Sequence, residues 1–156
     1  MEDHPSPHAN PKVADDVSDG ELFADLARIL KSADMVFDVG ANRAQFASRL
    51  LTVCDCPVYC FEPVPEDFDF LLELSSRDSR IKPFRLAITD DDVESIEFFI
   101  NQSSAGSSLL APLEGQSSQW LKPKEKVFAK ASRLDWFIEA ELERPKIDLL
   151  KIDAQG

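Results

Sequence analysis

Apolar residues fall in short runs separated by polar turns, and the run over residues 35–39 is the best defined. It reads Met-Val-Phe-Asp-Val and is followed directly by Gly40. A short apolar run with β-branched residues and a glycine after it favours a buried strand. The pattern predicts a strand, a tight glycine turn and a helix, with Asn42 as the helix cap. The helix is indicated by apolar residues at helical spacing, which are Phe46, Leu50, Leu51 and Cys54.

Other apolar runs predict the rest of an α/β fold with a Rossmann-like parallel sheet. Parallel strands that are buried on both faces appear in a sequence as nearly continuous apolar runs. Residues 57–61, 81–88 and 147–152 fit this description and are the second, third and fourth predicted strands. Residues 94–100 alternate weakly and predict a hairpin partner for the third strand. Residues 126–132 are another candidate strand.

Amphipathic helices are predicted between these strands. Ser18 followed by Glu21 is typical of a capping box, and apolar residues at helical spacing follow it. A second helix is expected to open at Pro65, because proline is favoured in the first turn. A third begins at Leu134 and is expected to end before Pro145.

The domain organisation follows from composition along the chain. Residues 1–19 are rich in Pro, Asp, Asn and Ser, and we expect a disordered acidic leader there. Residues 20–156 form one predicted domain, which is large enough to bury a core. Within it, the Ser- and Gly-rich residues 101–118 predict a long loop, and loops of this length are more often functional or mobile than mere connections.

The net charge, the apolar runs and the cysteines limit the partners, the compartment and the metals that we expect. A formal net charge of -12 argues against a nucleic-acid backbone or an anionic membrane as partner. No apolar run approaches the ~20 residues of a membrane span, so the cytoplasm is the expected compartment. Reduced thiols are expected at Cys54, Cys56 and Cys60. The two histidines, His4 and His8, lie in the leader, so no zinc site is expected.

The glycine turn after the first strand is the candidate ligand site. A dinucleotide fingerprint needs glycines where this chain has Asn42 and Gln45, and the Asp38 carboxylate would repel a pyrophosphate. A cationic ligand with an adenosine body suits the turn better, and S-adenosylmethionine (SAM) is such a ligand. Asp38, Gly40, Ala41 and Asn42 are the candidate contacts. The alternative is a strand-to-helix turn that binds nothing.

Three further candidates follow the other strands. Glu62 ends the second strand about 20 residues past the glycine turn, where a βαβ fold places the carboxylate that binds ribose hydroxyls. Ala87, at the end of the third strand, is another candidate cofactor contact. Asp153 ends the fourth strand and is the candidate for orienting or deprotonating the acceptor. A metal ligand or a helix cap are its alternative roles, and Lys151 is expected to pair with it.

Five blocks of sequence carry a resemblance to a known family. In order, they are Asp38-Val-Gly-Ala-Asn42, Phe61-Glu-Pro63, Ser107-Ser-Leu109, Arg133-Leu-Asp135 and Ile147-Asp-Leu-Leu-Lys-Ile-Asp-Ala-Gln-Gly156. Together they resemble the ordered blocks of the FkbM-family methyltransferases. The resemblance implies a SAM-dependent enzyme with the seven-stranded class I methyltransferase fold that methylates oxygen. It also implies a cofactor contact at Ser107.

Two departures from the family bear on function. The family usually has glycine where this chain has Ala44, and we expect weaker cofactor binding as a result. The family also continues with a helix and three strands where this chain ends, so we expect an incomplete sheet. The open alternatives are an inactive remnant and a nicotinamide-dependent oxidoreductase, the latter disfavoured by the missing glycines. A sugar hydroxyl, a polyketide or a lipid would all fit as small-molecule acceptor, and the oligomeric state is open.

Overall fold

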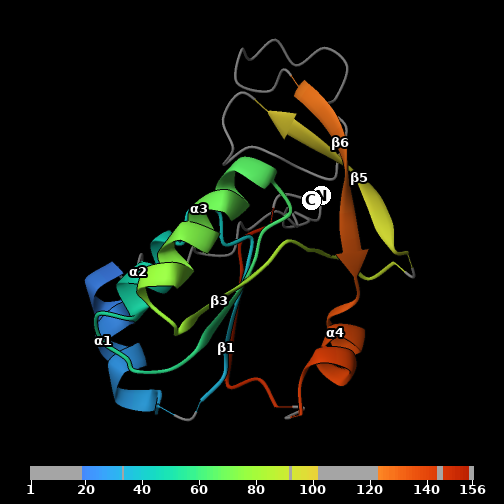
Figure 1. Ribbon diagram of the computed structural model, residues 1–156. Helices are drawn as coiled ribbons and strands as arrows, with labels where there is room; N and C mark the ends of the chain where they lie inside the picture. The colour runs from blue at the N-terminus through green and yellow to red at the C-terminus, as the bar shows by residue number, and fades with distance from the viewer. Residues whose placement is uncertain (1–18, 33, 92, 102–122, 144–145, 155–156) are drawn as a thin grey trace, which may run out of the picture.

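Four parallel strands form the central sheet, in the spatial order β3-β2-β1-β7. The computed structural model describes residues 19–32, 34–91, 93–101, 123–143 and 146–154 (Figure 1). The strands are β1 (Val36–Val39), β2 (Val58–Phe61), β3 (Ile81–Phe84) and β7 (Leu149–Ile152). In the order in which the sheet strands occur along the chain this is 3-2-1-4, which is part of the doubly wound arrangement. The mixed α/β fold is therefore compatible with the predicted Rossmann-like class.

Helices cover the two faces of this sheet unequally. On one face lie α1 (Asp19–Ile29), α2 (Gln45–Leu50) and α3 (Pro65–Arg77), while α4 (Leu134–Glu141) lies on the other (Figure 1). Alternate side chains of β1 pack into the apolar cores on the two faces of the sheet, since successive residues of a strand point to opposite faces. Val36 packs under α1–α3, whereas Phe37 packs with Phe137 of α4.

A second, three-stranded sheet has the order β4-β6-β5. Its strands are β4 (Ala87–Ile88), β5 (Ser95–Asn101) and β6 (Pro123–Ser132). The single third strand predicted over residues 81–88 is therefore wrong, because the chain divides it between two sheets. The amide of Leu86 donates to the carbonyl of Phe84 at 3.0 Å, and this tight turn redirects the chain.

The predicted hairpin between residues 94–100 and the third strand is also wrong. The partner of β5 is β6, to which it pairs antiparallel over its whole length, while β4 pairs parallel with β6. The candidate strand at residues 126–132 is confirmed and is longer than predicted. Alternation within a strand shows which of its faces is buried but does not reveal the partner strand.

β7 confirms the predicted fourth strand but not its burial. It pairs with β1 in parallel and is last in the order of the sheet. Leu149 packs against the core under α1–α3, but Leu150 is 41% exposed and Ile152 is 65% exposed. Among the described residues, α4 covers the Phe37 side of the sheet and does not reach these two side chains. Position in the sheet, rather than hydrophobicity, decides their exposure.

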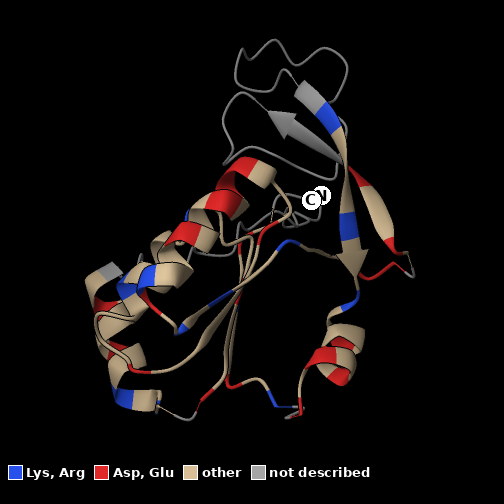
Figure 2. Cartoon of the chain, viewed as in Figure 1, with Lys and Arg blue, Asp and Glu red and all other residues tan. Residues whose placement is uncertain are grey.

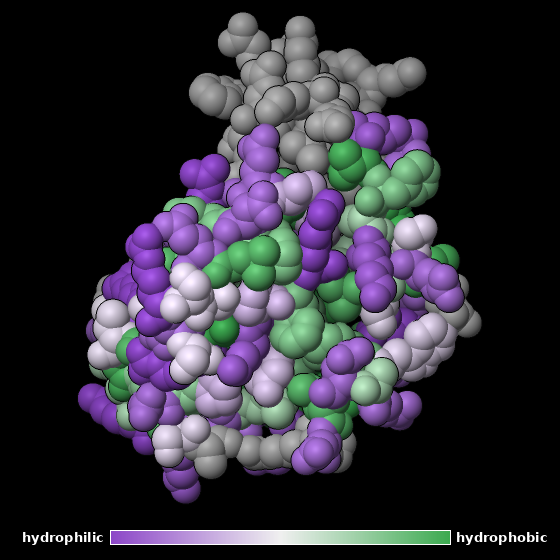
Figure 3. Space-filling view, viewed as in Figure 1, coloured by the Kyte–Doolittle hydropathy of each residue, from purple (hydrophilic) through white to green (hydrophobic). Residues whose placement is uncertain are grey.

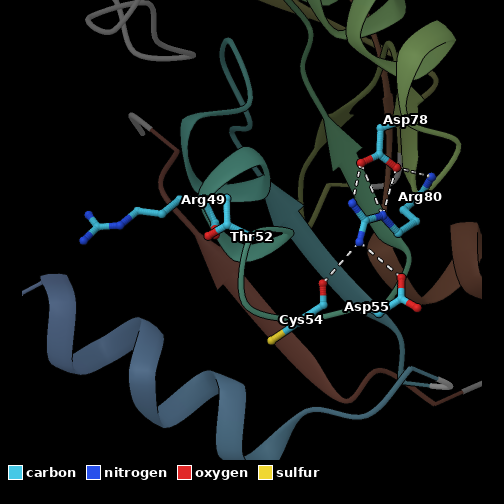
Figure 4. Close-up of polar contacts among 6 residues, drawn as sticks. All are labelled: Arg49, Thr52, Cys54, Asp55, Asp78 and Arg80. Carbon is cyan, nitrogen blue, oxygen red and sulfur yellow. Dashed lines mark hydrogen bonds and ion pairs between the residues drawn. The ribbon is translucent and has the colours of Figure 1, made fainter.

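An arginine joins chain segments at the amino end of β3 (Figure 4). Arg80 donates from Nε and Nη2 to the carboxylate of Asp78, with the shortest contact at 2.6 Å. Its Nη1 donates to the carbonyl of Cys54 and to the carboxylate of Asp55. The hydrogen bonds from Arg80 hold the pKa of Asp78 below its usual value. The segment before β2 is thereby tied to the segment before β3, at the end of the sheet opposite the glycine turn.

The predicted helices are confirmed where the structure describes them. The first runs from Asp19 to Ile29, and α3 has Pro65 at its start, as expected. The helix predicted to begin at Leu134 is α4, which ends at Glu141. Ser18, Pro145, most of the predicted leader and residues 102–118 of the predicted loop lie outside the described residues. No helix in the described part of the chain is long and apolar enough to cross a membrane.

The surface is mixed in character and strongly acidic. Acidic residues are frequent along α3 and α4 (Figure 2), in keeping with the formal net charge of -12. Apolar side chains are interspersed among polar ones on the face shown in Figure 3. Exposed apolar residues include Phe70 and Leu72 on α3. Single exposed apolar residues of this kind are normal for folded proteins.

Two adjacent leucines on α3 provide a test of this packing. Leu71 is fully buried in the core under the helices, whereas Leu72 is 46% exposed. We expect Leu71→Ala to lower the free energy of unfolding by ~2–5 kcal/mol, because it removes buried methyl groups and leaves a cavity. Leu72→Ala is the matched control and should cost less than ~1 kcal/mol. Urea unfolding measures both, and equal losses would contradict the assigned helix orientation.

Candidate active site

The glycine turn is fixed at the carboxyl ends of β1 and β2. These strands are neighbours, with Val39 opposite Phe61. The amides of Gly40 and Ala41 both donate to the carbonyl of Phe61, each at 3.1 Å. Ala41 is buried in the core beside α2. The turn therefore lies where ligands bind in open α/β sheets, outside the carboxyl ends of the strands.

Gly40 is required here for two separate reasons. Its φ is +72°, a backbone conformation that costs residues with a side chain about 1–2 kcal/mol. A Cβ at this position would also lie 2.3 Å from the carbonyl oxygen of Asp153. The turn thus runs in contact with the chain that leaves β7, and only a residue without a side chain permits this approach.

Asn42 does not cap the helix that follows, contrary to prediction. It adopts φ +49°, and the cap position of α2 is instead Ala44, with φ +59° and no side-chain hydrogen bond. The helix begins at Gln45, so Asn42 lies two residues before the cap position and cannot take that role. Its amide donates instead to Oε2 of Glu62 at 2.8 Å. Its side-chain Nδ2 lies 3.3 Å from Oδ2 of Asp67.

Glu62 connects the glycine turn to the end of β2. Its carboxylate is 5% exposed, and it accepts hydrogen bonds from the amides of Asn42, at 2.8 Å, and Val64, at 2.9 Å. Burial raises the pKa of Glu62 to about 7, and the two amides oppose that rise. The negative charges of Asp67 and Asp38 add to the rise. The predicted position of Glu62 beside the turn is confirmed.

Asp67 is a component of the site that sequence reasoning missed. It is fully buried in the first turn of α3, where an acid usually serves only the helix dipole. Nε of Arg43 donates to its Oδ1 at 2.9 Å, and the guanidinium is half exposed. Asp67 precedes buried Leu71 by four positions on the same helix face, and that spacing is the signal that could have revealed its burial.

The second missed component is an ion pair between β1 and β7. Nζ of Lys151 lies 2.8 Å from Oδ1 of Asp38, and the two residues are direct neighbours in the register of the sheet. Asp38 is fully buried, and the ammonium of Lys151 supplies its counter-charge. Burial raises the pKa of Asp38, and Lys151 opposes that rise. The predicted partner of Lys151, Asp153, is more distant, at 3.7 Å.

The remaining candidates are Asp153, Ala87 and Ser107. Asp153 follows β7, with its amide donating to the carbonyl of Val39 at 3.0 Å and its side chain 73% exposed. It therefore follows the fourth central strand, as predicted, and lies beside the glycine turn. Ala87 belongs to β4 instead of the end of a central strand, because the central strand ends at Phe84. Its side chain is buried in the core of the second sheet with Val64, Ala129 and Ala131. Ser107 lies outside the described residues.

The three cysteines carry free thiols. Cys56 and Cys60 are buried, and burial raises the pKa of Cys56 to about 11. These two thiols therefore stay protonated at neutral pH, and protonated thiols are poor nucleophiles. In the part of the chain that the structure describes, no group of three or more His, Cys, Asp or Glu residues could hold a metal ion.

Comparison with known families agrees with this arrangement. The family model described as the methyltransferase FkbM domain matches residues 38–156, and the match begins at the buried Asp38. The chain belongs to the FkbM methyltransferase family. The FkbM domain contains every site residue described above, and SAM is the usual cofactor of methyltransferases of this kind. No curated protein and no solved structure matches the chain.

Substitution of two glycines tests the geometry of the turn. Gly40→Ala should lower the free energy of unfolding by at least ~2 kcal/mol, because the alanine meets both a positive φ and the carbonyl of Asp153. Gly20→Ala is the control, since Gly20 is exposed in α1 and the change should stabilise by up to ~1 kcal/mol. Urea unfolding of both variants measures the difference. If both variants changed the free energy of unfolding in the same direction, the strained backbone assigned to the Gly40 turn would be contradicted.

The raised pKa of Glu62 predicts a pH dependence of stability. The ordinary pKa of Glu62 is 4.5, and it is about 7 in the folded chain, so folding favours the protonated form. Stability from this group is present below pH 4.5 and is lost as pH rises to about 7, by up to ~1.4 kcal/mol per pH unit. Glu62→Gln should remove this part of the loss. Urea unfolding between pH 4.5 and 8 compares the slopes, and parallel slopes would contradict the assignment.

Proposed function

We propose that the FkbM domain binds SAM at the Gly40 turn and methylates a hydroxyl oxygen of a small molecule. The observation that carries the proposal is the buried carboxylate of Glu62, held 2.8 Å from the amide of Asn42 at the end of β2. A carboxylate at this place in a βαβ unit is suited to the hydroxyls of a ribose. Each Glu62 oxygen accepts one backbone hydrogen bond, and a carboxylate oxygen has capacity for a second.

The charge around the turn favours a cationic ligand. Asp38, Glu62 and Asp67 are all buried beside it. The buried carboxylate of Asp38 lies 2.8 Å from the ammonium of Lys151, so this carboxylate already pairs with an ammonium group within the chain. A pyrophosphate would instead bring two negative charges to these carboxylates. When bound, SAM supplies an electrophilic methyl group. Its positively charged ammonium and sulfonium groups complement the negative charge of these carboxylates.

Asp153 is the residue that we assign to the acceptor. Its carboxylate lies beside the turn, after the carboxyl end of β7. The side chain is exposed, so a ligand that enters from solvent can reach it. An ionised carboxylate there can orient an acceptor hydroxyl and take its proton. A strongly anionic acceptor such as a nucleic acid fits poorly with a domain of this net charge.

Titration calorimetry with SAM and with NAD tests the proposal. We expect SAM to bind and NAD to bind more weakly. Glu62→Ala should weaken SAM binding by ~1.5–3 kcal/mol, the range for a hydrogen bond to a charged group. Glu139→Ala is the control, because Glu139 is exposed on α4 and should leave the dissociation constant unchanged. Tighter binding of NAD, or no effect of Glu62→Ala, would overturn the proposal.

A further inference from the structure

The ammonium of Lys151 occupies a complete cation site at the glycine turn. Its Nζ lies 2.8 Å from Oδ1 of Asp38 and donates a hydrogen bond to the carbonyl of Gly40 at 3.1 Å. Oδ2 of Asp153 is 3.7 Å away, and the ring centre of Phe46 is 5.9 Å away. A buried carboxylate, a backbone carbonyl, a second carboxylate and an aromatic ring are the groups that proteins use to bind ammonium ligands.

This position is the one that a ligand ammonium would need. Asp38 is fully buried, and the ammonium of Lys151, whose side chain is 23% exposed, lies directly against it. A second ammonium at hydrogen-bond distance from Asp38 would lie close to Nζ of Lys151, and two like charges at that separation repel in a site of low dielectric constant. Lys151 and a ligand ammonium are therefore alternatives for the same carboxylate.

We propose that Lys151 is a tethered competitor of the ligand for Asp38, which a ligand displaces only if it carries its own ammonium group. The inference rests on the proposed function, since it takes the ligand to be SAM or a relative of it. Lys151 is then a positioning residue: it neutralises Asp38 in the empty site, and its displacement reduces the affinity that a ligand ammonium gains from Asp38.

A second carboxylate near Lys151 makes the displacement feasible. The carboxylate of Asp153 is exposed and already lies 3.7 Å from Nζ, so a rotation about the flexible lysine side chain brings the ammonium to it. Lys151 in that position leaves Oδ1 of Asp38 to the ligand. It also places a positive charge beside Asp153, the residue that we assign to the acceptor.

Affinity ratios test the competition. S-adenosylhomocysteine carries an ammonium that its deaminated analogue lacks, while both keep the carboxylate, so the ratio of their dissociation constants reports the contact with Asp38. At pH 8 we expect Lys151→Met to change this ratio at least tenfold in favour of S-adenosylhomocysteine, because no internal ammonium has to leave. Asp38→Asn combined with Lys151→Met should abolish the preference. Lys130→Met, at an exposed position on β6, is the control and should leave the ratio unchanged.

The results separate this inference from the proposed function. A purely structural Lys151 would make Lys151→Met weaken both ligands equally, and an unchanged or reversed ratio overturns the inference alone. If neither ligand binds the unmodified chain, the proposed function fails and the inference fails with it.

A labelling measurement on the unmodified chain applies even if the variants do not fold. Acetylation of Lys151, followed by mass spectrometry, should accelerate several-fold on adding S-adenosylhomocysteine. It should not accelerate on adding the deaminated analogue. Equal protection of Lys151 by both ligands would overturn the competition.

Discussion

The burial of one negative charge in the central strand constrains the whole site. Asp38 is fully buried in β1, and an isolated carboxylate there would be strongly disfavoured. β7 supplies the compensating charge, because its register places Lys151 directly beside Asp38. The same register brings the backbone of Asp153 against Gly40, where a side chain cannot fit. The pairing of two strands thus determines the ion pair, the path of the glycine turn and the position of the exposed acid.

A second group of buried acids holds the far side of the turn. Glu62 binds the amide of Asn42, and Asp67 binds the side chains of Asn42 and Arg43. Three residues of the turn region have positive φ, and two of them, Asn42 and Ala44, are not glycine. Such conformations persist where surrounding contacts fix them. At Ala44 the positive φ gives a physical reason for the glycine that the family usually has there: the backbone conformation suits glycine whether or not a ligand is near.

The sequence predicted the parts of the site that depend on local signals. β1, the Gly40 turn, the end of β2 at Glu62 and the start of α3 at Pro65 each follow from a few adjacent residues. What it did not predict depends on partners distant in the chain. The partner of β5, for example, is a strand beyond a long segment. Asp38 is the single charge in the apolar run 35–39, and Lys151 is one of two charges in the run 147–152. Only the register of the sheet identifies them as partners.

The contact between the glycine turn and β7 also has a consequence for the order of folding. Gly40 and Lys151 are 111 positions apart, so their contact closes a very long loop, whereas β1, β2 and β3 are joined by short connections. Pairings between distant segments form slowly, since the entropy of loop closure is lost before the contact is gained. A chain with only β1–β3 assembled would leave Asp38 without Lys151, and water would have to hydrate its carboxylate. The turn acquires its final form only when β7 joins the sheet, so assembly of the site and completion of this four-stranded sheet are one event.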